Sequence, residues 1–560
     1  MSFMWCLALW TWVGEPDLLG RALQALGGEE ALSQLTCIHV SGQVSSSGLE
    51  GRYQLWLEAP DRLKTLLDFE LIRIETLCQG DEGWTRQAGI WRALEGDALD
   101  QARRSHLSFP LLAYARRGIR GRSLGAKEIE GRRYWGLEFQ EGEDRKNQFW
   151  LEAETYLPHM EVRWQGDQET KITYDDYRVV AGCMVPFSER RDTPQRLVQI
   201  TLDQVEVVER FAPGFFEHPD QRYADQPFGI GLMTVPRTIY KENDGLFGSI
   251  NQESWFFHVV VSETYGRSLT PTHASLKYYS GEELLETRTL NKPSLSGLSG
   301  VRFATAAGLD EVFDLRFQCS FMTEPPVDKM QVDLTLVAHD GTTLNESLEV
   351  TLSRYEPKTE LWFPLEGYFV ILAGGDFNEH HAQEWSQHHA LDILALGPDR
   401  QLVSGYAATN QDFVSWGREV LAPADGVVVY TRNDVPDNAN PPRVDKESLN
   451  KLPDPLWRVG GNSVVIDHGN GEFSFLAHMQ QGSVRVAMGE VVKRGQVLGL
   501  LGNSGNSSAP HLHYHLMAGD TLFRSDPIPL RFKNVFFDGV AKGFATGPLK
   551  RGVYLRANWQ

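Results

Sequence analysis

Alternating apolar and polar residues cover most of the first two hundred positions and predict β-strands. The pattern is clearest in "CIHVSGQV" (37–44), "GRYQLWLEAP" (51–60), "RYWGLEF" (133–139) and "KITYDDYRVV" (171–180). Successive side chains of a strand point to opposite faces, so such segments expose one face and bury the other. The pattern therefore predicts an antiparallel sheet with one covered face.

Helical periodicity is confined to two stretches of this part. Between 18 and 26 the apolar residues recur at the spacing of one helix face, and Gly27-Gly28 is predicted to end the helix. A second helical segment is predicted within 99–118, "LDQARRSHLSFPLLAYARRG", packed against the sheet.

Strand patterns return between about 242 and 356 without helices between them. "SWFFHVVVSE" (254–263) and "KMQVDLTLVAHDGTTLNESLEVTLSRY" (329–355) are strand-rich, and Asp340-Gly341 is a strong hairpin signal. This region is predicted to be a β-sandwich, similar to an immunoglobulin domain. The Pro/Gly-punctuated passage 224–238 before it is predicted to be a linker.

The last part of the chain again alternates short strands with glycine-containing turns, which predicts an antiparallel sheet. The fold class is therefore mainly β and multidomain. The predicted domains are 15–222 (curved antiparallel sheet with helices), 223–357 (sandwich) and 358–560 (antiparallel sheet with a C-terminal extension), after a signal-like segment at 1–14.

Composition changes this picture in a few respects. A chain of 560 residues is too long for one core. The net charge of -20 argues against a nucleic-acid partner, because phosphate binding needs basic patches. The apolar run 3–13 is too short to span a bilayer. It is similar to the core of a secretory signal, with a buried N-terminal segment as the alternative. No transmembrane helix is predicted, and the expected location is the cell envelope, periplasmic or secreted.

Histidines cluster near the C-terminus: nine of the sixteen lie between His380 and His515. In "HLHYHL", the histidines at 511, 513 and 515 alternate with apolar residues, so a strand would place them on one face. Such clustering favours a metal or proton-transfer site. The five cysteines lie outside this region, so a metal there would have nitrogen and oxygen ligands.

The spacing of His388 and Asp392, HxxxD, together with His513, fits a hydrolytic zinc site with three protein ligands and an open position for water. His478 and His511 could accept the proton of that water or donate a hydrogen bond to the developing oxyanion. The helical HExxH motif is absent. The base would therefore be a histidine.

Several motifs in order resemble the lysostaphin-type zinc endopeptidases: HxxxD, "LAPADGVV", "GNSVVIDHG", "FLAH" and "GQVLGLLGNSGNSSAPHLH", within 361–530. The resemblance implies Zn²⁺-dependent cleavage of peptide bonds in peptidoglycan cross-links. It implies a substrate groove bordered by 503–510. It also implies that His388, Asp392 and His513 are the metal ligands. It implies that His478 and His511 are the catalytic pair.

Three histidines of this region have other expected positions. His515 stands where the family usually has glutamate, and is expected to hydrogen-bond a metal ligand. His468 fits a structural position at a strand end. Some members of the family carry an N-x-H element upstream, so His380 or His381 competes with His388 for the metal. The HxxxD spacing and the short loop closure favour His388.

The first domain resembles lipoprotein-carrier (LolA-like) domains through "ALGGEEAL", "WLEAPDRLK" and "GDEGWTRQ", over 15–219. That resemblance implies a curved half-barrel able to hold a lipid or lipoprotein. The favoured function is a zinc endopeptidase acting on peptidoglycan peptides, because every expected site residue is present. The alternatives are a non-catalytic peptidoglycan-binding regulator and a lipid- or lipoprotein-binding protein with an appended hydrolase.

Overall fold

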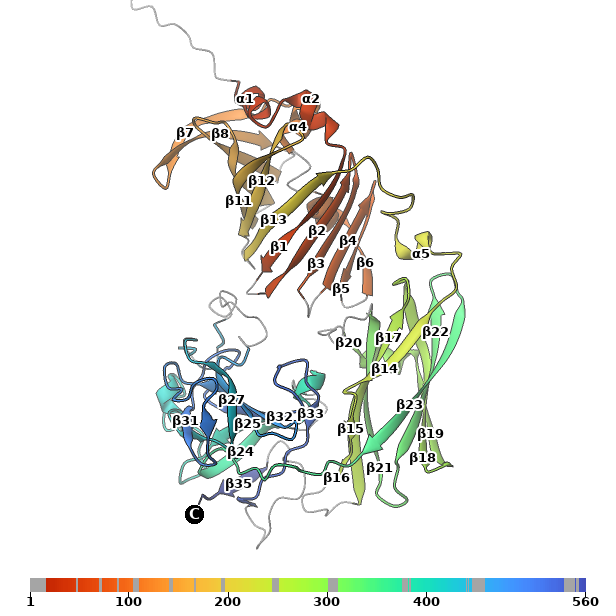
Figure 1. The fold of residues 1–560 in the computed structure, drawn as a ribbon, viewed down its shortest axis with the longest axis vertical. Coiled ribbons are helices and arrows are strands. Elements are labelled where there is room, and N and C mark those ends of the chain that lie inside the picture. The colour runs from red at the N-terminus through yellow and green to blue at the C-terminus, as the bar shows by residue number, and fades with distance from the viewer. Residues whose placement is uncertain are drawn as a thin grey trace, which may run out of the picture. The chain divides into compact units, whose positions relative to one another are not determined.

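A computed structural model of the chain provides the structure (Figure 1). It describes residues 17–46, 49–69, 73–87, 90–103, 110–140, 145–165, 168–192, 197–243, 251–300, 311–374, 381, 384–439, 441, 443–445, 459–537, 549 and 553–559. The predicted signal segment 1–14 lies outside these residues. The chain forms two compact units: Met1–Asp68, Glu75–Thr85 and Ala93–Phe216 make the first, and Phe69–Ile74, Arg86–Arg92 and Glu217–Gln560 the second.

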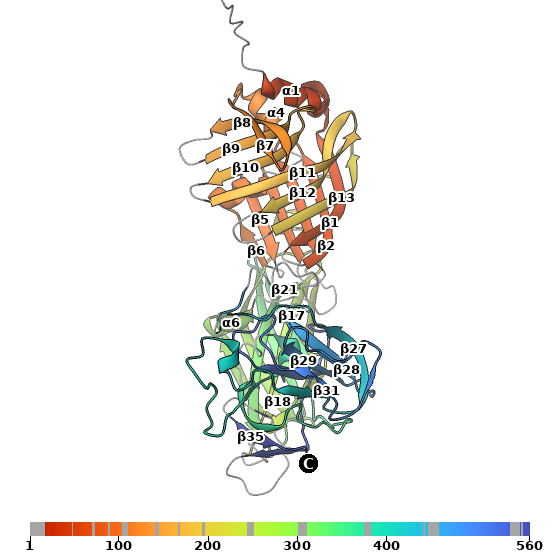
Figure 2. The ribbon, with the colours of Figure 1, turned by 90° about the vertical axis from the view of Figure 1, so that its left-hand side faces the viewer.

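The first unit is built on one 13-stranded antiparallel sheet, in the order β6-β5-β4-β3-β2-β1-β13-β12-β11-β10-β9-β8-β7 (Figures 1 and 2). The alternation seen in the sequence therefore predicted its strands correctly. The strands are β1 (Cys37–Ser46), β2 (Leu49–Glu58), β3 (Arg62–Asp68), β4 (Arg73–Gln79), β5 (Glu82–Gln87), β6 (Ile90–Ala93), β7 (Arg122–Ile129), β8 (Arg132–Gln140), β9 (Arg145–Glu152), β10 (Pro158–Gln165), β11 (Gln168–Val180), β12 (Cys183–Asp192) and β13 (Leu197–Val207).

Four short helices accompany this sheet: α1 (Leu18–Ala25), α2 (Glu29–Gln34), α3 (Gly96–Arg103) and α4 (Pro110–Arg116). The apolar stripe of α1 is buried, as its spacing predicts. Gly27 follows with a φ of 121°, a conformation that L side chains rarely adopt. In α4, Tyr114 stacks on Phe139 of β8 with 3.9 Å between ring centroids. Both predicted helical stretches are confirmed.

The covered face of this sheet also carries charge. Arg163 donates from Nε to Glu161 Oε1 at 2.6 Å within β10, and Tyr174 of β11 donates its hydroxyl to Glu161 Oε2 at 2.7 Å. On β12, Arg191 pairs with Glu189. Both glutamates are buried. The apolar face predicted from the sequence therefore contains two ion pairs.

The second unit begins with a sandwich of two five-stranded sheets. One has the order β14-β17-β21-β20 with β16 beside β17, and the other the order β15-β23-β22-β18-β19. Apolar residues of both sheets form one core, and the hairpin expected at Asp340-Gly341 joins β22 to β23. Strand β14 lies inside 224–238, so the linker prediction is wrong there. The elements are α5 (Pro219–Arg222), β14 (Ile230–Val235), β15 (Ile239–Tyr240), β16 (Glu242–Asn243), β17 (Gln252–Glu263), β18 (Leu269–Ser280), β19 (Glu283–Asn291), α6 (Lys292–Leu298), β20 (Ser299–Gly300), β21 (Glu311–Met322), β22 (Lys329–Ala338) and β23 (Thr343–Ser353).

The rest of the second unit is a ten-stranded sheet, in the order β30-β27-β28-β29-β32-β25-β24-β35-β34, with β33 beside β32 and a separate β26-β31 pair. The predicted C-terminal extension contributes β34 and β35 to it. The elements are β24 (Gly367–Gly374), η4 (Trp385–Gln387), β25 (Leu391–Ala395), η5 (Asn410–Asp412), β26 (Glu419–Leu421), β27 (Gly426–Arg432), β28 (Asn462–Asp467), β29 (Phe473–Met479), β30 (Val491–Val492), β31 (Val497–Leu500), β32 (Leu512–Met517), β33 (Pro527–Ile528), β34 (Val535–Phe537) and β35 (Tyr554–Ala557).

The predicted fold class, mainly β and multidomain, is confirmed. Among the helices that the structure describes, none is long and apolar enough to cross a membrane.

Candidate active site

Three adjacent strands, β29, β32 and β25, carry most of the predicted site residues. Asp392 of β25 lies directly opposite His513 of β32 in the ladder, and His513 lies opposite Ala477 of β29 on its other side. The neighbours Leu512 and Tyr514 have no exposed surface and point into the core. The alternation read from the sequence therefore turns His513 toward the opposite face, beside Asp392.

His381, Asp392 and His513 form a group of donors that could hold a metal ion, with all ligand atoms within 4.8 Å of one another. His381 Nε2 lies 3.4 Å and His513 Nδ1 3.1 Å from Asp392 Oδ1. Donor atoms on a tetrahedral zinc with bonds of about 2.0–2.1 Å lie roughly 3.3–3.4 Å apart. The three side chains are only 2%, 10% and 7% exposed. These residues therefore fit a zinc ion in number, type and spacing.

The structure does not bring His388 to this group. The backbone N–H of Ala390 donates to the carbonyl of Gln387, so His388 sits in a tight turn before β25 begins. Its ring packs edge-on against Phe256 of β17, and its Nδ1 has no hydrogen-bond partner among the residues that the structure describes. Burial, with His389 and His258 nearby, holds the pKa of His388 well below its usual value. HxxxD spacing therefore does not make His388 a neighbour of Asp392, and His381 occupies the predicted place. His380 lies outside the described residues.

His478 and His511 lie beside the group with 4.7 Å between their ring centroids. His478 Nδ1 is 2.8 Å from the carbonyl oxygen of Ser504, and His511 Nδ1 is 2.8 Å from that of Ala509. A carbonyl only accepts, so each Nδ1 carries a proton and donates. In the neutral rings, the lone pair is therefore on Nε2.

The two rings differ in their tendency to hold a second proton. Burial, followed by the charges of His511 and His513, holds the pKa of His478 well below its usual value. Burial also opposes protonation of His511, but the carboxylate of Asp392, 3.3 Å from Nε2, outweighs it and raises the pKa. A bound cation would oppose this second effect through its own charge.

The backbone at His478 is in the left-handed region, with φ at 63°. A residue with a Cβ occupies it at a cost of about 1–3 kcal/mol, and such conformations concentrate at functional sites. Two backbone hydrogen bonds hold it, from His478 N to Gly460 O and from Gly502 N to His478 O.

His515 and His468 have the supporting positions expected of them. His515 has no exposed surface, and its Nδ1 lies 3.0 Å from Nε2 of His513. This contact leaves Nδ1 of His513 to face Asp392. His468 bonds through Nδ1 to the carbonyl of Asp425 and through Nε2 to the hydroxyl of Ser474, which is a structural role.

A buried amide network behind His511 had no signal in the sequence. Asn438 Nδ2 lies 2.8–2.9 Å from the carbonyl oxygens of Asn503, Gly505 and Ser507. The Ser507 hydroxyl donates to Asn503 Oδ1 at 2.7 Å and lies 3.2 Å from His511 Nδ1. Asn438 is 65 residues from Asn503 and belongs to no motif. The network fixes the loop that leads into the histidine strand.

Residues 411–525 match the protein family described as Peptidase family M23. The chain contains an M23 peptidase domain. The matched range includes His478, His511 and His513 and begins after Asp392. The family predicted for the C-terminal domain is therefore confirmed. The roles of individual residues stay predictions.

Two curated relatives match part of the chain. The peptidoglycan DD-endopeptidase ShyA of Vibrio cholerae serotype O1 is 37% identical over 135 residues, which are 24% of this chain and 25% of that protein. The cell division protein DipM of Caulobacter vibrioides is 29% identical over 106 residues, 19% of this chain and 14% of that protein. The match thus spans a quarter or less of these relatives' own lengths.

Among the solved structures, the chain has a likeness to a putative outer membrane lipoprotein-sorting protein domain from Vibrio parahaemolyticus. It is 11% identical and covers 36% of this chain and 97% of that one, with a TM-score of 0.27.

Proposed function

We propose that the protein is a zinc-dependent endopeptidase that hydrolyses peptide bonds in peptidoglycan. The observation that carries this proposal is the group of His381, Asp392 and His513, spaced for tetrahedral zinc inside a sheet that carries an M23 domain. The name of the curated relative, a peptidoglycan DD-endopeptidase, supports the substrate class.

The donor set leaves one position open, because two neutral imidazoles and one carboxylate fill three of four tetrahedral sites. Zinc held there lowers the pKa of a bound water toward neutrality and polarises the scissile carbonyl. We assign the ligand role to His381 in place of the predicted His388, since His381 alone of these two lies beside Asp392. His515 holds the ring of His513 so that Nδ1 faces the metal.

His478 and His511 handle protons and developing charge. Their Nδ1–H groups are engaged by backbone carbonyls, so their Nε2 atoms are the ones available to the reaction. The ring that is neutral can accept the proton of the attacking water, and the ring that is protonated can donate to the oxyanion. These are the roles predicted from the sequence.

The substrate class sets the location. Peptidoglycan peptides lie outside the cytoplasm, so we propose that the protein works in the cell envelope, periplasmic or secreted. A lipid or lipoprotein ligand for the first unit stays a prediction, and native mass spectrometry of the purified chain tests it.

The test of the function is digestion of purified peptidoglycan, with mass spectrometry of the soluble muropeptides. We expect release of peptides cut at the cross-link, loss of release with a chelator, and its return on adding zinc. The matched control is Asp392→Ala. Binding of peptidoglycan without release by the zinc-loaded protein would favour the non-catalytic regulator and overturn the proposal.

A further inference from the structure

The segment between the first two proposed ligands, His381 and Asp392, packs against the β-sandwich. Trp385 of η4 forms a buried apolar cluster with Val235 of β14 and Val260 of β17, with Met233 at its edge. Three residues later the ring of His388 packs on Phe256, which is also on β17. The outer face of one sandwich sheet is therefore the surface on which this segment rests.

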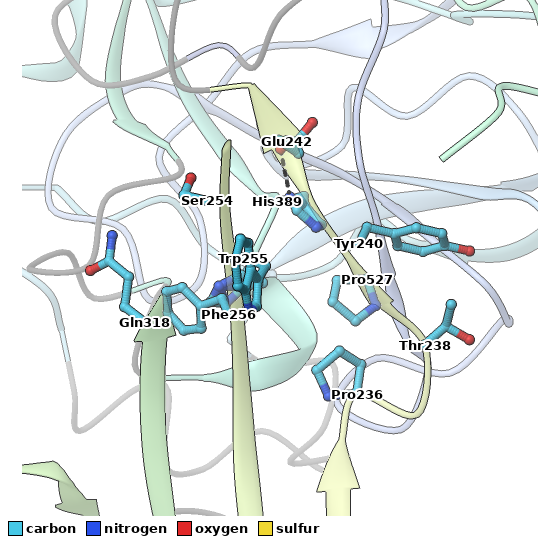
Figure 3. Close-up of a pocket in the computed structure, with 11 residues that line it drawn as sticks. Pro236, Thr238, Tyr240, Glu242, Ser254, Trp255, Phe256, Gln318, His389 and Pro527 are labelled. Atoms are coloured by element: carbon cyan, nitrogen blue, oxygen red, sulfur yellow. Dashed lines mark ion pairs between the residues drawn. The ribbon is translucent and has the colours of Figure 1, made fainter. Parts of the chain in front are cut away.

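A buried charge fixes the next residue. Glu242 of β16 pairs through Oε2 with His389 Nδ1 at 3.3 Å, and through Oε1 with Arg531 Nη1 at 2.6 Å. Figure 3 shows Glu242 and His389 facing each other at the edge of a pocket, with Trp255 and Phe256 of the sandwich along its wall. Glu242 thus joins a sandwich strand to two places in the sheet that carries the M23 domain.

The protonation state of Glu242 agrees with this role. Burial by itself raises the pKa of Glu242, but the hydrogen bond from His389 and the charges of His389 and Arg531 outweigh it and lower the pKa to about 2. The side chain is therefore a carboxylate at neutral pH. Removing the charge of Glu242 would leave the charges of His389 and Arg531 without their partner.

A second connection lies on the other side of the same pocket. The Asp526 carboxylate accepts hydrogen bonds from the backbone N–H groups of Arg237 at 3.4 Å and Thr238 at 3.3 Å. Pro527 follows in β33, which pairs with β32, the strand of His513. The sandwich therefore contacts the elements on both sides of the proposed metal site.

The short chain between His389 and Asp392 links the position of His389 to that of the proposed metal ligand. His389 is three residues before Asp392, about 10 Å of chain at the rise of a strand. The hydrogen bond from Ala390 N to Gln387 O closes a tight turn, which limits how far His389 can move independently of Asp392. A shift of His389 must therefore be taken up at Asp392 or in the turn.

We infer that Glu242 is a positioning residue for the metal site: through His389 it holds the segment that presents His381 and Asp392, so that the sandwich sets the affinity for zinc. The inference rests on the proposed function, since it assumes that these residues bind zinc. On this inference, the sandwich helps to position the metal ligands and is more than a spacer.

The test is the zinc dissociation constant of the full chain, measured by competition with a chromophoric chelator. In Glu242→Gln, the shape is kept and the charge is lost, and we expect zinc to bind about 10–100-fold more weakly, as for other groups that orient metal ligands. The matched control is Glu263→Gln. Glu263 lies in the same sandwich, is more deeply buried than Glu242, and pairs with Arg267 at 2.7 Å. This control should lower the melting temperature and leave zinc affinity unchanged.

Replacing zinc with Co²⁺ adds a readout that does not depend on the stability of the fold. The visible absorption of Co²⁺ depends on ligand geometry, so Glu242→Gln should change the spectrum and Glu263→Gln should not. If Glu242→Gln does not fold, Phe256→Leu replaces it. That change weakens the contact with His388 and leaves no charged group without its partner. It is also expected to weaken zinc binding.

Two results would overturn the inference while leaving the proposed function intact: wild-type zinc affinity in Glu242→Gln, or equal losses in Glu242→Gln and Glu263→Gln. If the unmodified chain binds no zinc, the proposed function fails, and the inference fails with it.

Discussion

Replacing His381 and His388 separately decides which of the two holds the metal. His381 Nε2 lies 3.4 Å from Asp392 Oδ1, so His381→Ala removes one of three protein donors. Loss of a group that only orients a ligand typically costs about 10–100-fold in metal affinity. Loss of a ligand must cost more, so we expect over about 100-fold, which is roughly 2.7 kcal/mol or more.

His388→Ala should act on stability instead. His388 is 7% exposed and its ring packs on Phe256, so the substitution leaves a cavity at the contact with the sandwich. Core truncations of this kind typically cost about 2–5 kcal/mol. We expect a lower melting temperature and a smaller loss of zinc affinity than in His381→Ala, no greater than that of Glu242→Gln.

The assay is zinc content after gel filtration against a weak chelator, followed by chelator competition, with thermal unfolding on the same samples. Stoichiometric zinc in His381→Ala together with metal-free His388→Ala would refute the geometric assignment. It would show instead that the HxxxD spacing identifies the ligand.

Three further predictions concern the surroundings of the metal. His478→Ala and His511→Ala should each keep zinc but lose about 10²–10⁴-fold in turnover, as measured on a cross-linked peptide substrate; loss of zinc would make them ligands. Asn438→Ala leaves buried carbonyls without their side-chain donor, so the free energy of unfolding should fall by about 1–3 kcal/mol in urea titrations, and an unchanged value would show that the network contributes nothing. At Gly505 a Cβ would lie 2.4 Å from the backbone nitrogen of Gly461, whereas at Gly469 it would meet nothing within 4 Å. Both glycines have positive φ. Gly469→Ala should therefore lower the free energy of unfolding by about 1–2 kcal/mol from strain alone, and Gly505→Ala should lower it by about 1–3 kcal/mol more. Equal losses of unfolding free energy in the two variants would contradict this packing.

Local periodicity predicted what depends on local geometry. The stripe that begins at Leu18 gave α1 and its end at Gly27, and alternation in "HLHYHL" placed His513 and His515 on one face. These succeed because a strand or helix period fixes the direction of each side chain within one element.

The first ligand could not be predicted this way, because its position depends on contacts distant in sequence. Trp385 packs on Val235 and Val260, well over a hundred residues earlier in the chain, and this packing turns His388 toward the sandwich. The family match begins only at residue 411, after both His381 and His388. Spacing to Asp392 and short loop closure then favoured His388, but the structure groups His381, not His388, with Asp392. The same limit applies to β14, whose pairing with β17 overrides the Pro/Gly signal of a linker.

The two ion pairs on the covered face of the 13-stranded sheet bear on how that sheet reaches a single register during folding. A slip of one residue between neighbouring strands would turn Glu161 or Glu189 to the opposite face and leave its former surroundings without the charge. The same slip would turn the apolar side chains of the strand away from the core. Each arginine lies on the same strand as its glutamate, so the ion pair would move with the strand. Tyr174, which donates to Glu161 across the β10–β11 ladder, adds a hydrogen bond that only the native register forms. This cross-strand hydrogen bond to a buried charge therefore distinguishes the native register of β10 and β11 from a slipped one.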